Sequence, residues 1–229
     1  MLDFYISIET EKNKLMDMFC IQDVGFSLEK RAEQYHFPLD LAKKMYNLPR
    51  YQWDRKLEDF LSQAYQKNKN KLDNALSFFQ GYWTQHNENY FEPINCFFDT
   101  PIPSYQVLLA HFLDAISNWS EPNIVLNAYS YQTPNPLYHT YTLLYEIILS
   151  QVFIRTRQIK SPKEALDDKL WMASELTAFS FLATTFPEFS KVSGTGYPQV
   201  DIFAVKSRKL MEMHLKFEDF IYQLLNLIH

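Results

Sequence analysis

Apolar side chains recur at helical spacing along most of this chain. Between Tyr51 and Trp83 their spacing predicts a helix of about eight turns. Residues 8–20 and 38–47 predict two shorter helices, because each carries an apolar stripe and ends at a turn or proline signal. Residues 87–102 show no regular period, so we expect an irregular segment there.

The middle of the chain predicts one strand between two helices. Pro101 can occupy a first helical turn without losing a hydrogen bond, so we expect a helix from there through Ile116. Residues 123–131 are rich in β-branched and aromatic side chains and predict a strand. The Asn135-Pro136 step predicts the start of the next helix, over 138–153.

The last third also predicts helices. Residues 161–164 (SPKE) form a capping box with proline at the first helical position, which predicts a helix as far as Phe186. After a loop over 190–198, we expect one C-terminal helix with an apolar stripe formed by Phe203, Leu210, Phe217, Leu224 and Leu225. The predicted fold class is therefore mainly α, with long packed helices and at most a small β-sheet.

Composition narrows the class of protein. Four glycines in 229 residues favour long helices, because a sheet-rich fold needs more glycine in its turns. A net charge of −5 argues against nucleic acid as a partner. The N-terminus lacks signal-peptide features, and the longest apolar run, over 143–154, is too short to cross a bilayer. We expect no membrane contact and a cytoplasmic location, with Cys20 and Cys96 as reduced, buried thiols.

Charge is distributed unevenly along the chain. From Leu72 to Ile154 no Lys or Arg occurs, although the chain has 22 of them elsewhere. Such a segment cannot hold a phosphate through side-chain cations. No Gly-rich phosphate loop, GxSxG or CxxC motif occurs anywhere, which argues against nucleotide-binding folds, serine hydrolases of that type and zinc fingers.

Two predicted helices each carry one carboxylate in an apolar setting. Glu146 lies within 138–153 and Glu175 within 171–186. An unpaired buried carboxylate is unfavourable, so each must be hydrogen-bonded, paired or protonated. The two could share a cation, a metal or a proton, or each could bond a tyrosine, a histidine or a helix terminus of the core.

The order strand, turn, helix with Glu146 and helix with Glu175 resembles a zincin metallopeptidase core of the gluzincin type, over about residues 121–190. In that family the first helix carries HExxH, whose histidines bind zinc and whose glutamate is the general base, and a glutamate on the second helix completes the ligand set. The resemblance makes Glu146 the candidate catalytic residue and Glu175 the third ligand. Tyr145 and Leu149 replace the histidines, so it implies a degenerate scaffold without metal or other cofactor.

Further candidates surround these glutamates. His139 lies two helical turns before Glu146 on a related face, while His111 and His214 also fall in predicted helices. Tyr141 and Tyr145 belong to a group of tyrosines that could line a cleft for a peptide or sugar, or could simply belong to the core. The candidate ligand-binding residues are thus Tyr141, Tyr145, Glu175 and His139. Glu33-x-x-His36 has di-iron spacing but occurs once, where such sites need two copies.

Three functions stay open from the sequence. The first is a non-catalytic binding or regulatory module, on a degenerate peptidase-like or plain helical scaffold, with a peptide or small-molecule ligand. The second is a metal-dependent hydrolase with an unconventional site at Glu146 and Glu175. The third is a helical oligomeric scaffold, a homodimer through the C-terminal helix. We expect a single globular unit over 1–229, with a possible subdivision into a helical half, 1–119, and a zincin-like half, 120–229.

Overall fold

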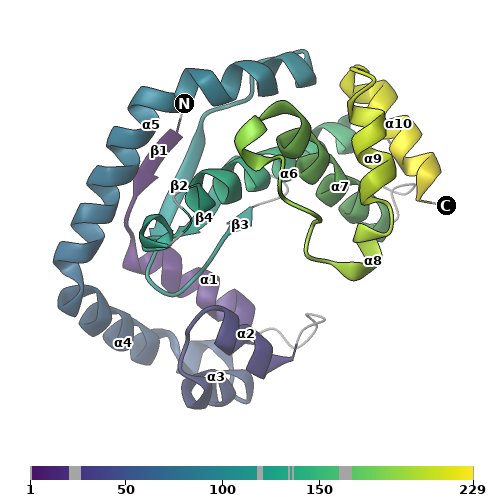
Figure 1. The fold of residues 1–229 in the computed structure, drawn as a ribbon. Helices are drawn as coiled ribbons and strands as arrows, with labels where there is room; N and C mark the ends of the chain where they lie inside the picture. Colours follow the sequence, from purple (N-terminus) through teal and green to yellow (C-terminus); the bar gives the residue numbers. More distant parts are fainter. Residues whose placement is uncertain are drawn as a thin grey trace.

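The computed structural model describes residues 2–20, 27–117, 121–133, 135, 137–159 and 167–228. Most of these residues are helical, and a small sheet lies among the helices, which confirms the mainly α fold class (Figure 1). The first part of the chain contains β1 (Leu2–Tyr5), α1 (Ile8–Cys20), α2 (Leu28–Gln34), α3 (Leu39–Tyr46), α4 (Asp54–Lys67) and α5 (Lys69–Phe98). The second part contains β2 (Tyr105–Ala110), β3 (Ile116–Ser117), β4 (Asn123–Asn127), α6 (Tyr138–Ile159), α7 (Asp167–Thr185), α8 (Pro198–Asp201), α9 (Ala204–Met211) and α10 (Phe217–Leu227).

The sheet is small and mostly parallel. Its strand order is β1-β2-β4-β3, with β1, β2 and β4 parallel and the short edge strand β3 antiparallel to β4. Val107 and Leu109 pack into a core shared with α5, α6 and α7, whereas Leu108 and Ala110 pack into a second core with α1 and α4. Both faces of the sheet are therefore covered by helices, as is usual for parallel strands.

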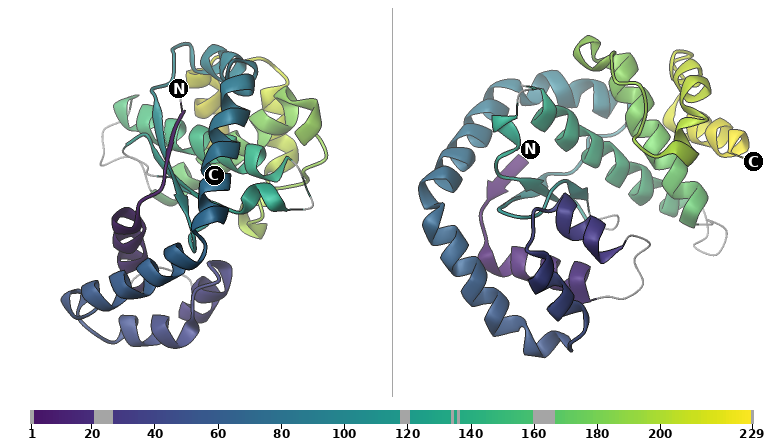
Figure 2. Two further views of the ribbon diagram at one scale, coloured as in Figure 1. Left: turned by 90° about the vertical axis from the view of Figure 1, so that its left-hand side faces the viewer. Right: turned by 60° about the horizontal axis from the view of Figure 1, so that its bottom comes forward.

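The predicted helix over 51–83 is two helices. The chain turns at Asn68, and α5 then continues for 30 residues through the segment expected to be irregular, including Pro93. Tyr90, Phe91, Ile94 and Phe98 are all buried at helical spacing, and this burial outweighs the one backbone hydrogen bond that proline removes. Figure 2 shows α5 running along the outside of the sheet.

The predicted helix from Pro101 through Ile116 is wrong. This segment forms β2, a loop and β3, and His111 lies in that loop. Because β2 is buried on both faces, its sequence YQVLLA lacks the alternation of a half-buried strand and cannot be told from a buried helix by period. The strand predicted over 123–131 is confirmed for β4, which ends at Asn127.

The single C-terminal helix is also wrong, since this region forms α8, α9 and α10. His214 has a φ of 51° in the turn between α9 and α10 and so lies outside a helix. The apolar stripe still packs on the core: Phe217 and Leu224 are buried, while Phe203, Leu210 and Leu225 are partly buried against it. The capping box over 161–164 falls outside the described residues.

One smaller prediction also fails, since Cys96 is exposed rather than buried.

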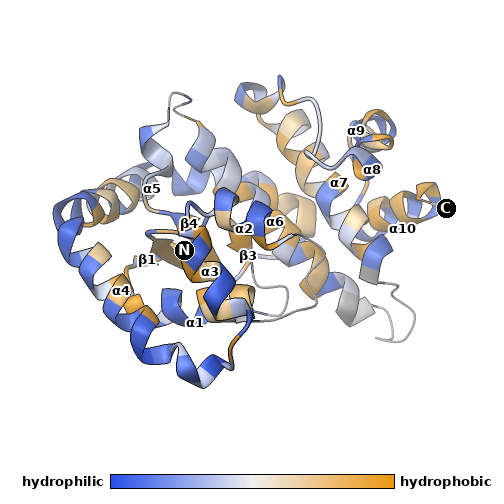
Figure 3. Cartoon of the chain, turned by 90° about the horizontal axis from the view of Figure 1, so that it is seen from below, coloured by the Kyte–Doolittle hydropathy of each residue, from blue (hydrophilic) through white to orange (hydrophobic). Residues whose placement is uncertain are grey.

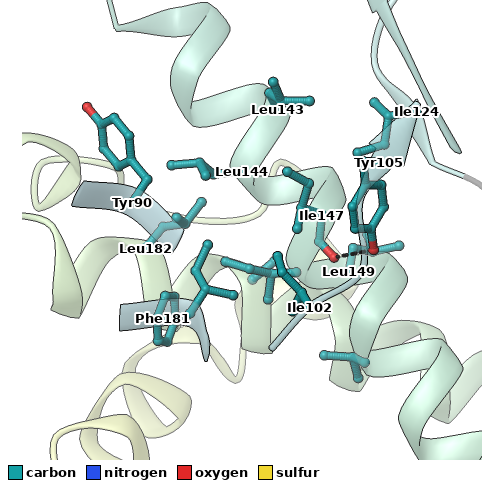
Figure 4. Close-up of a cluster of buried hydrophobic side chains, with 14 of the residues drawn as sticks. Tyr90, Ile102, Tyr105, Ile124, Leu143, Leu144, Ile147, Leu149, Phe181 and Leu182 are labelled. Atoms are coloured by element: carbon teal, nitrogen blue, oxygen red, sulfur yellow. Dashed lines mark hydrogen bonds between the residues drawn. The ribbon is translucent and has the colours of Figure 1, made fainter. Parts of the chain in front are cut away.

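The largest core cluster lies between the sheet, α5, α6 and α7 (Figure 4). Tyr105 of β2 is fully buried there, and its hydroxyl is hydrogen-bonded to Gln151 Nε2 at 2.7 Å and Ser150 Oγ at 3.2 Å. Apolar residues dominate α6 and α7, whereas α4 and α5 alternate apolar and polar residues (Figure 3). No helix in the described ranges combines the length and hydropathy that crossing a membrane requires.

Candidate functional site

The first half of α6 presents one partly exposed face. Its members are Tyr138, Tyr141, Thr142, Tyr145 and Glu146, and we call them the open face of α6. The residues between them on this helix are buried, so this stripe is the part of the first half of α6 that solvent reaches. Because residues three and four positions apart share one face of a helix, Tyr138, Tyr141, Tyr145 and Glu146 lie side by side.

Tyr145 connects the open face to α7. Its hydroxyl donates to Glu175 Oε2 at 2.5 Å and also lies 3.2 Å from the Glu175 backbone oxygen. Glu175 is 4% exposed, and burial raises the pKa of its carboxyl to about 7 despite the tyrosine hydrogen bond. The negative charge of Glu146 raises this pKa further, so the two glutamates interact electrostatically.

Glu146 lies on the other side of the same face, toward β3. Its side chain keeps some solvent contact, but protein atoms surround its carboxyl closely enough that burial raises its pKa. The polar groups of Ser117 oppose this rise, and the charge of Asp114 adds to it.

The charge around the open face is negative. Asp201 adds to the field at Glu175, and its Oδ1 accepts hydrogen bonds from the Thr195 amide at 2.5 Å and hydroxyl at 2.8 Å. Arg208 lowers the pKa of Tyr141, but its guanidinium donates to two backbone carbonyls and stacks on the Phe179 ring. Two of its hydrogen bonds are therefore made to backbone oxygens.

The described residues do not bring together a set of metal-binding side chains. No grouping of three or more His, Cys, Asp or Glu side chains that could hold a metal ion occurs among the described residues. Tyr145 offers a phenol and Leu149 an alkyl group at the two positions where the resemblance would require imidazole. The residues present thus do not fit a catalytic zinc of the gluzincin kind.

His139 is not part of this site. Its ring lies 5.0–5.5 Å, between centroids, from the rings of Phe78, Phe79 and Tyr82, and it is 2% exposed. Neither ring nitrogen has a hydrogen-bond partner among the residues that the structure describes, and burial lowers the pKa of this histidine to about 4. His139 and Glu146 are seven residues apart on α6, and they contact different elements. His139 packs against α5, whereas Glu146 lies near Ser117 of β3.

Glu11, which no sequence pattern indicated, is the most extensively hydrogen-bonded buried carboxylate of the described residues. Its oxygens accept hydrogen bonds from the Tyr65 hydroxyl and from the backbone amides of His111, Phe112 and Leu113. The helix 8–20 holds several other charged residues, so no local pattern distinguishes this one. Only the tertiary fold, which brings α1 to the end of β2, shows its role.

The chain matches no protein-family model, no curated protein and no solved structure.

Proposed function

We propose that this protein is a non-catalytic binding module in which the open face of α6, together with Glu175, binds a basic segment of a peptide. The contact between Tyr145 and Glu175 carries the proposal. It joins a partly exposed aromatic face to a carboxyl that is buried, poorly compensated and available for a cationic ligand.

The same contact supports a degenerate zincin scaffold. In the resemblance, positions 145 and 175 are ligands of one zinc ion, so their side chains must approach each other. Here β4, α6 and α7 follow in the required order, and the Tyr145 hydroxyl bonds Glu175 directly. The remaining ligand position, Leu149, is buried in the apolar core.

Charge and shape favour a basic peptide as ligand. The charge of Asp114 raises the pKa of Glu146, and the charges of Glu146 and Asp201 raise the pKa of Glu175. A cation that binds here therefore relieves the repulsion between these carboxylates. Tyrosines add flat apolar area with polar tips, which suits the stems of Lys and Arg.

Binding of a fluorescein-labelled tetra-arginine peptide tests the proposal, with a tetraglutamate peptide as the contrast. We expect the basic peptide to bind and the acidic one not to bind. The double variant Glu146→Gln/Glu175→Gln should weaken binding about tenfold or more, since each charge contact at a partly buried site is worth about 1.5–3 kcal/mol. Glu212→Gln, at an exposed site beyond α9, is the matched control and should leave binding unchanged.

Proton release gives a second readout. Because the pKa of Glu175 is raised to about 7, much of this residue is protonated at pH 6, and a bound cation favours its ionised form. Calorimetry at pH 6 in two buffers of different ionisation enthalpy should detect a released proton in the wild type and a smaller release in Glu175→Gln. Binding that is unaffected by both substitutions would contradict the proposal.

Metal analysis separates this proposal from a hydrolase. We expect the purified protein to carry no stoichiometric zinc and not to cleave casein, because imidazole is missing at positions 145 and 149. One equivalent of metal, removed by a chelator with loss of a measurable activity, would favour the hydrolase instead. Sedimentation velocity would detect a dimer and so favour the oligomeric scaffold.

A further inference from the structure

A second candidate site lies at the carboxyl ends of β2 and β4. A cavity of about 520 Å³ opens there, and the residues that line it include His111, Phe112, Asp114, Tyr129, Ser130 and Tyr138. The first three follow β2, and Tyr129 and Ser130 follow β4. Parallel strands commonly present ligand sites beyond their carboxyl ends, and this volume suits a small molecule.

Ser130 is the feature that points to a ligand. The residue is 4% exposed, it lines the cavity, and its Oγ has no hydrogen-bond partner among the described residues. A buried hydroxyl without a partner is unfavourable, so it needs a polar atom that the protein does not supply. A ligand hydroxyl in the cavity would provide one.

His111 lines the same cavity and is held in place by other parts of the protein. Its Nδ1 lies 2.5 Å from the Tyr129 hydroxyl, and its backbone amide donates to Glu11, which also fixes the next two residues of the loop. Burial lowers the pKa of His111, and the charge of Lys71 lowers it further. The neutral ring can therefore both donate and accept hydrogen bonds near pH 7.

The rest of the lining favours hydroxyl groups over anions. Among the described residues no Lys or Arg lines the cavity, so a phosphate or carboxylate ligand would find positive charge only at the imidazoles of His36 and His111, and Asp114 would repel it. Asp114 accepts from the Ala115 amide at 2.9 Å through Oδ1 and, through Oδ2, a long hydrogen bond of 3.4 Å from Tyr138, so its carboxylate keeps lone pairs that ligand hydroxyls can use. Phe112, Tyr129 and Tyr138 add aromatic surface for the carbon skeleton of a ligand.

We propose that this cavity binds a neutral, hydroxyl-rich ligand of monosaccharide size, with Ser130 and Asp114 bonding its hydroxyls. The two sites share Tyr138 and Asp114, but this proposal does not rest on the basic-peptide site, because it depends on Ser130 and uses neither Glu175 nor Tyr145. Each site can therefore fail while the other stands.

Saturation-transfer NMR on the full chain tests this inference. The probes are glucose, galactose, mannose, xylose, ribose and N-acetylglucosamine at millimolar concentration, with tetramethylammonium and methyl phosphate as contrasts. We expect transfer to at least one sugar and to neither contrast. No transfer to any sugar, or transfer to tetramethylammonium alone, would overturn the assigned ligand class.

Two variants test whether the sugar binds in this cavity. Ser130→Ala should weaken sugar binding about tenfold, which corresponds to one lost hydrogen bond in a buried site. Without ligand the same variant should melt at an equal or higher temperature, because it removes an unpaired polar group. Asp114→Asn should keep sugar binding within a few-fold, since an amide also bonds hydroxyls.

Ser62→Ala, on the exposed side of α4, is the matched control and should change neither binding nor melting. Sugar binding that is insensitive to Ser130→Ala would show that the ligand lies elsewhere. A Ser130→Ala protein that melts clearly lower would show that the hydroxyl already has a structural role.

Discussion

Glu11 and Glu175 are both buried glutamates on helices, yet their surroundings differ. Glu11 is fully buried and accepts four hydrogen bonds, three of them from consecutive backbone amides. Glu175 is 4% exposed, and its carboxyl accepts a bond from Tyr145 while other carboxylates lie in range. Burial raises the pKa of both.

The comparison separates a structural carboxylate from a candidate binding one. Around Glu11 the donors come from the protein itself, and they fix the loop that follows β2. Around Glu175 the side-chain donors are Tyr145 and Trp171 and the neighbouring charges are negative, which is why we propose a cation as its partner. Burial alone therefore does not distinguish a structural carboxylate from a candidate binding one. The number of hydrogen-bond donors that the protein itself provides to the carboxylate distinguishes them.

The largest expected effect is on folding. Glu11→Ala leaves three loop amides and the Tyr65 hydroxyl without their acceptor, so we expect a loss of about 3–5 kcal/mol in the free energy of unfolding. Urea denaturation at pH 7 measures it. Glu175→Gln, the matched change at the other carboxyl, should be neutral or stabilising because it removes an ionisable group from a low-dielectric site. Similar losses in both variants would erase the distinction.

The next effect concerns pH. The pKa of Glu175 is raised to about 7 from 4.5, so the folded state keeps a proton that the unfolded state releases in this window. Stability contributed by this proton is complete below pH 4.5 and is lost as pH rises through 7, by up to about 3 kcal/mol.

Glu11 and Glu146 have pKa shifts of the same sign, so the useful quantity is the difference between wild type and Glu175→Gln. The wild type should lose more stability than the variant between pH 4.5 and 7. Parallel stability curves would mean that Glu175 ionises freely in the folded protein.

One of the two carboxylate sites could be predicted in part from the sequence. Glu146 and Glu175 stand out because each interrupts an apolar helix, and α6 and α7 have the expected order. Glu11 could not be identified, because its partners are about 54 to 102 residues away along the chain. Three of these partners follow β2, which was itself predicted as helix, since burial on both faces removes the alternation that identifies a strand.

The smallest expected effect concerns the Tyr145 hydroxyl, which bonds Glu175. Tyr145→Phe removes the donor to Glu175 and should reduce the free energy of unfolding by about 1 kcal/mol. This hydrogen bond lowers the pKa of Glu175, so its loss should raise that pKa further above its present value of about 7.

Carboxyl ¹³C NMR over a pH titration measures the shift, and Tyr222→Phe, at a residue that is 67% exposed, is the control. An unchanged titration of Glu175 in Tyr145→Phe would mean that the hydroxyl does not bond the carboxyl in solution. The link between the open face of α6 and α7 would then be lost, and with it the support for the basic-peptide site. If Tyr145→Phe raises the pKa of Glu175 but barely changes the free energy of unfolding, the contact affects the ionisation of Glu175 more than the stability of the fold.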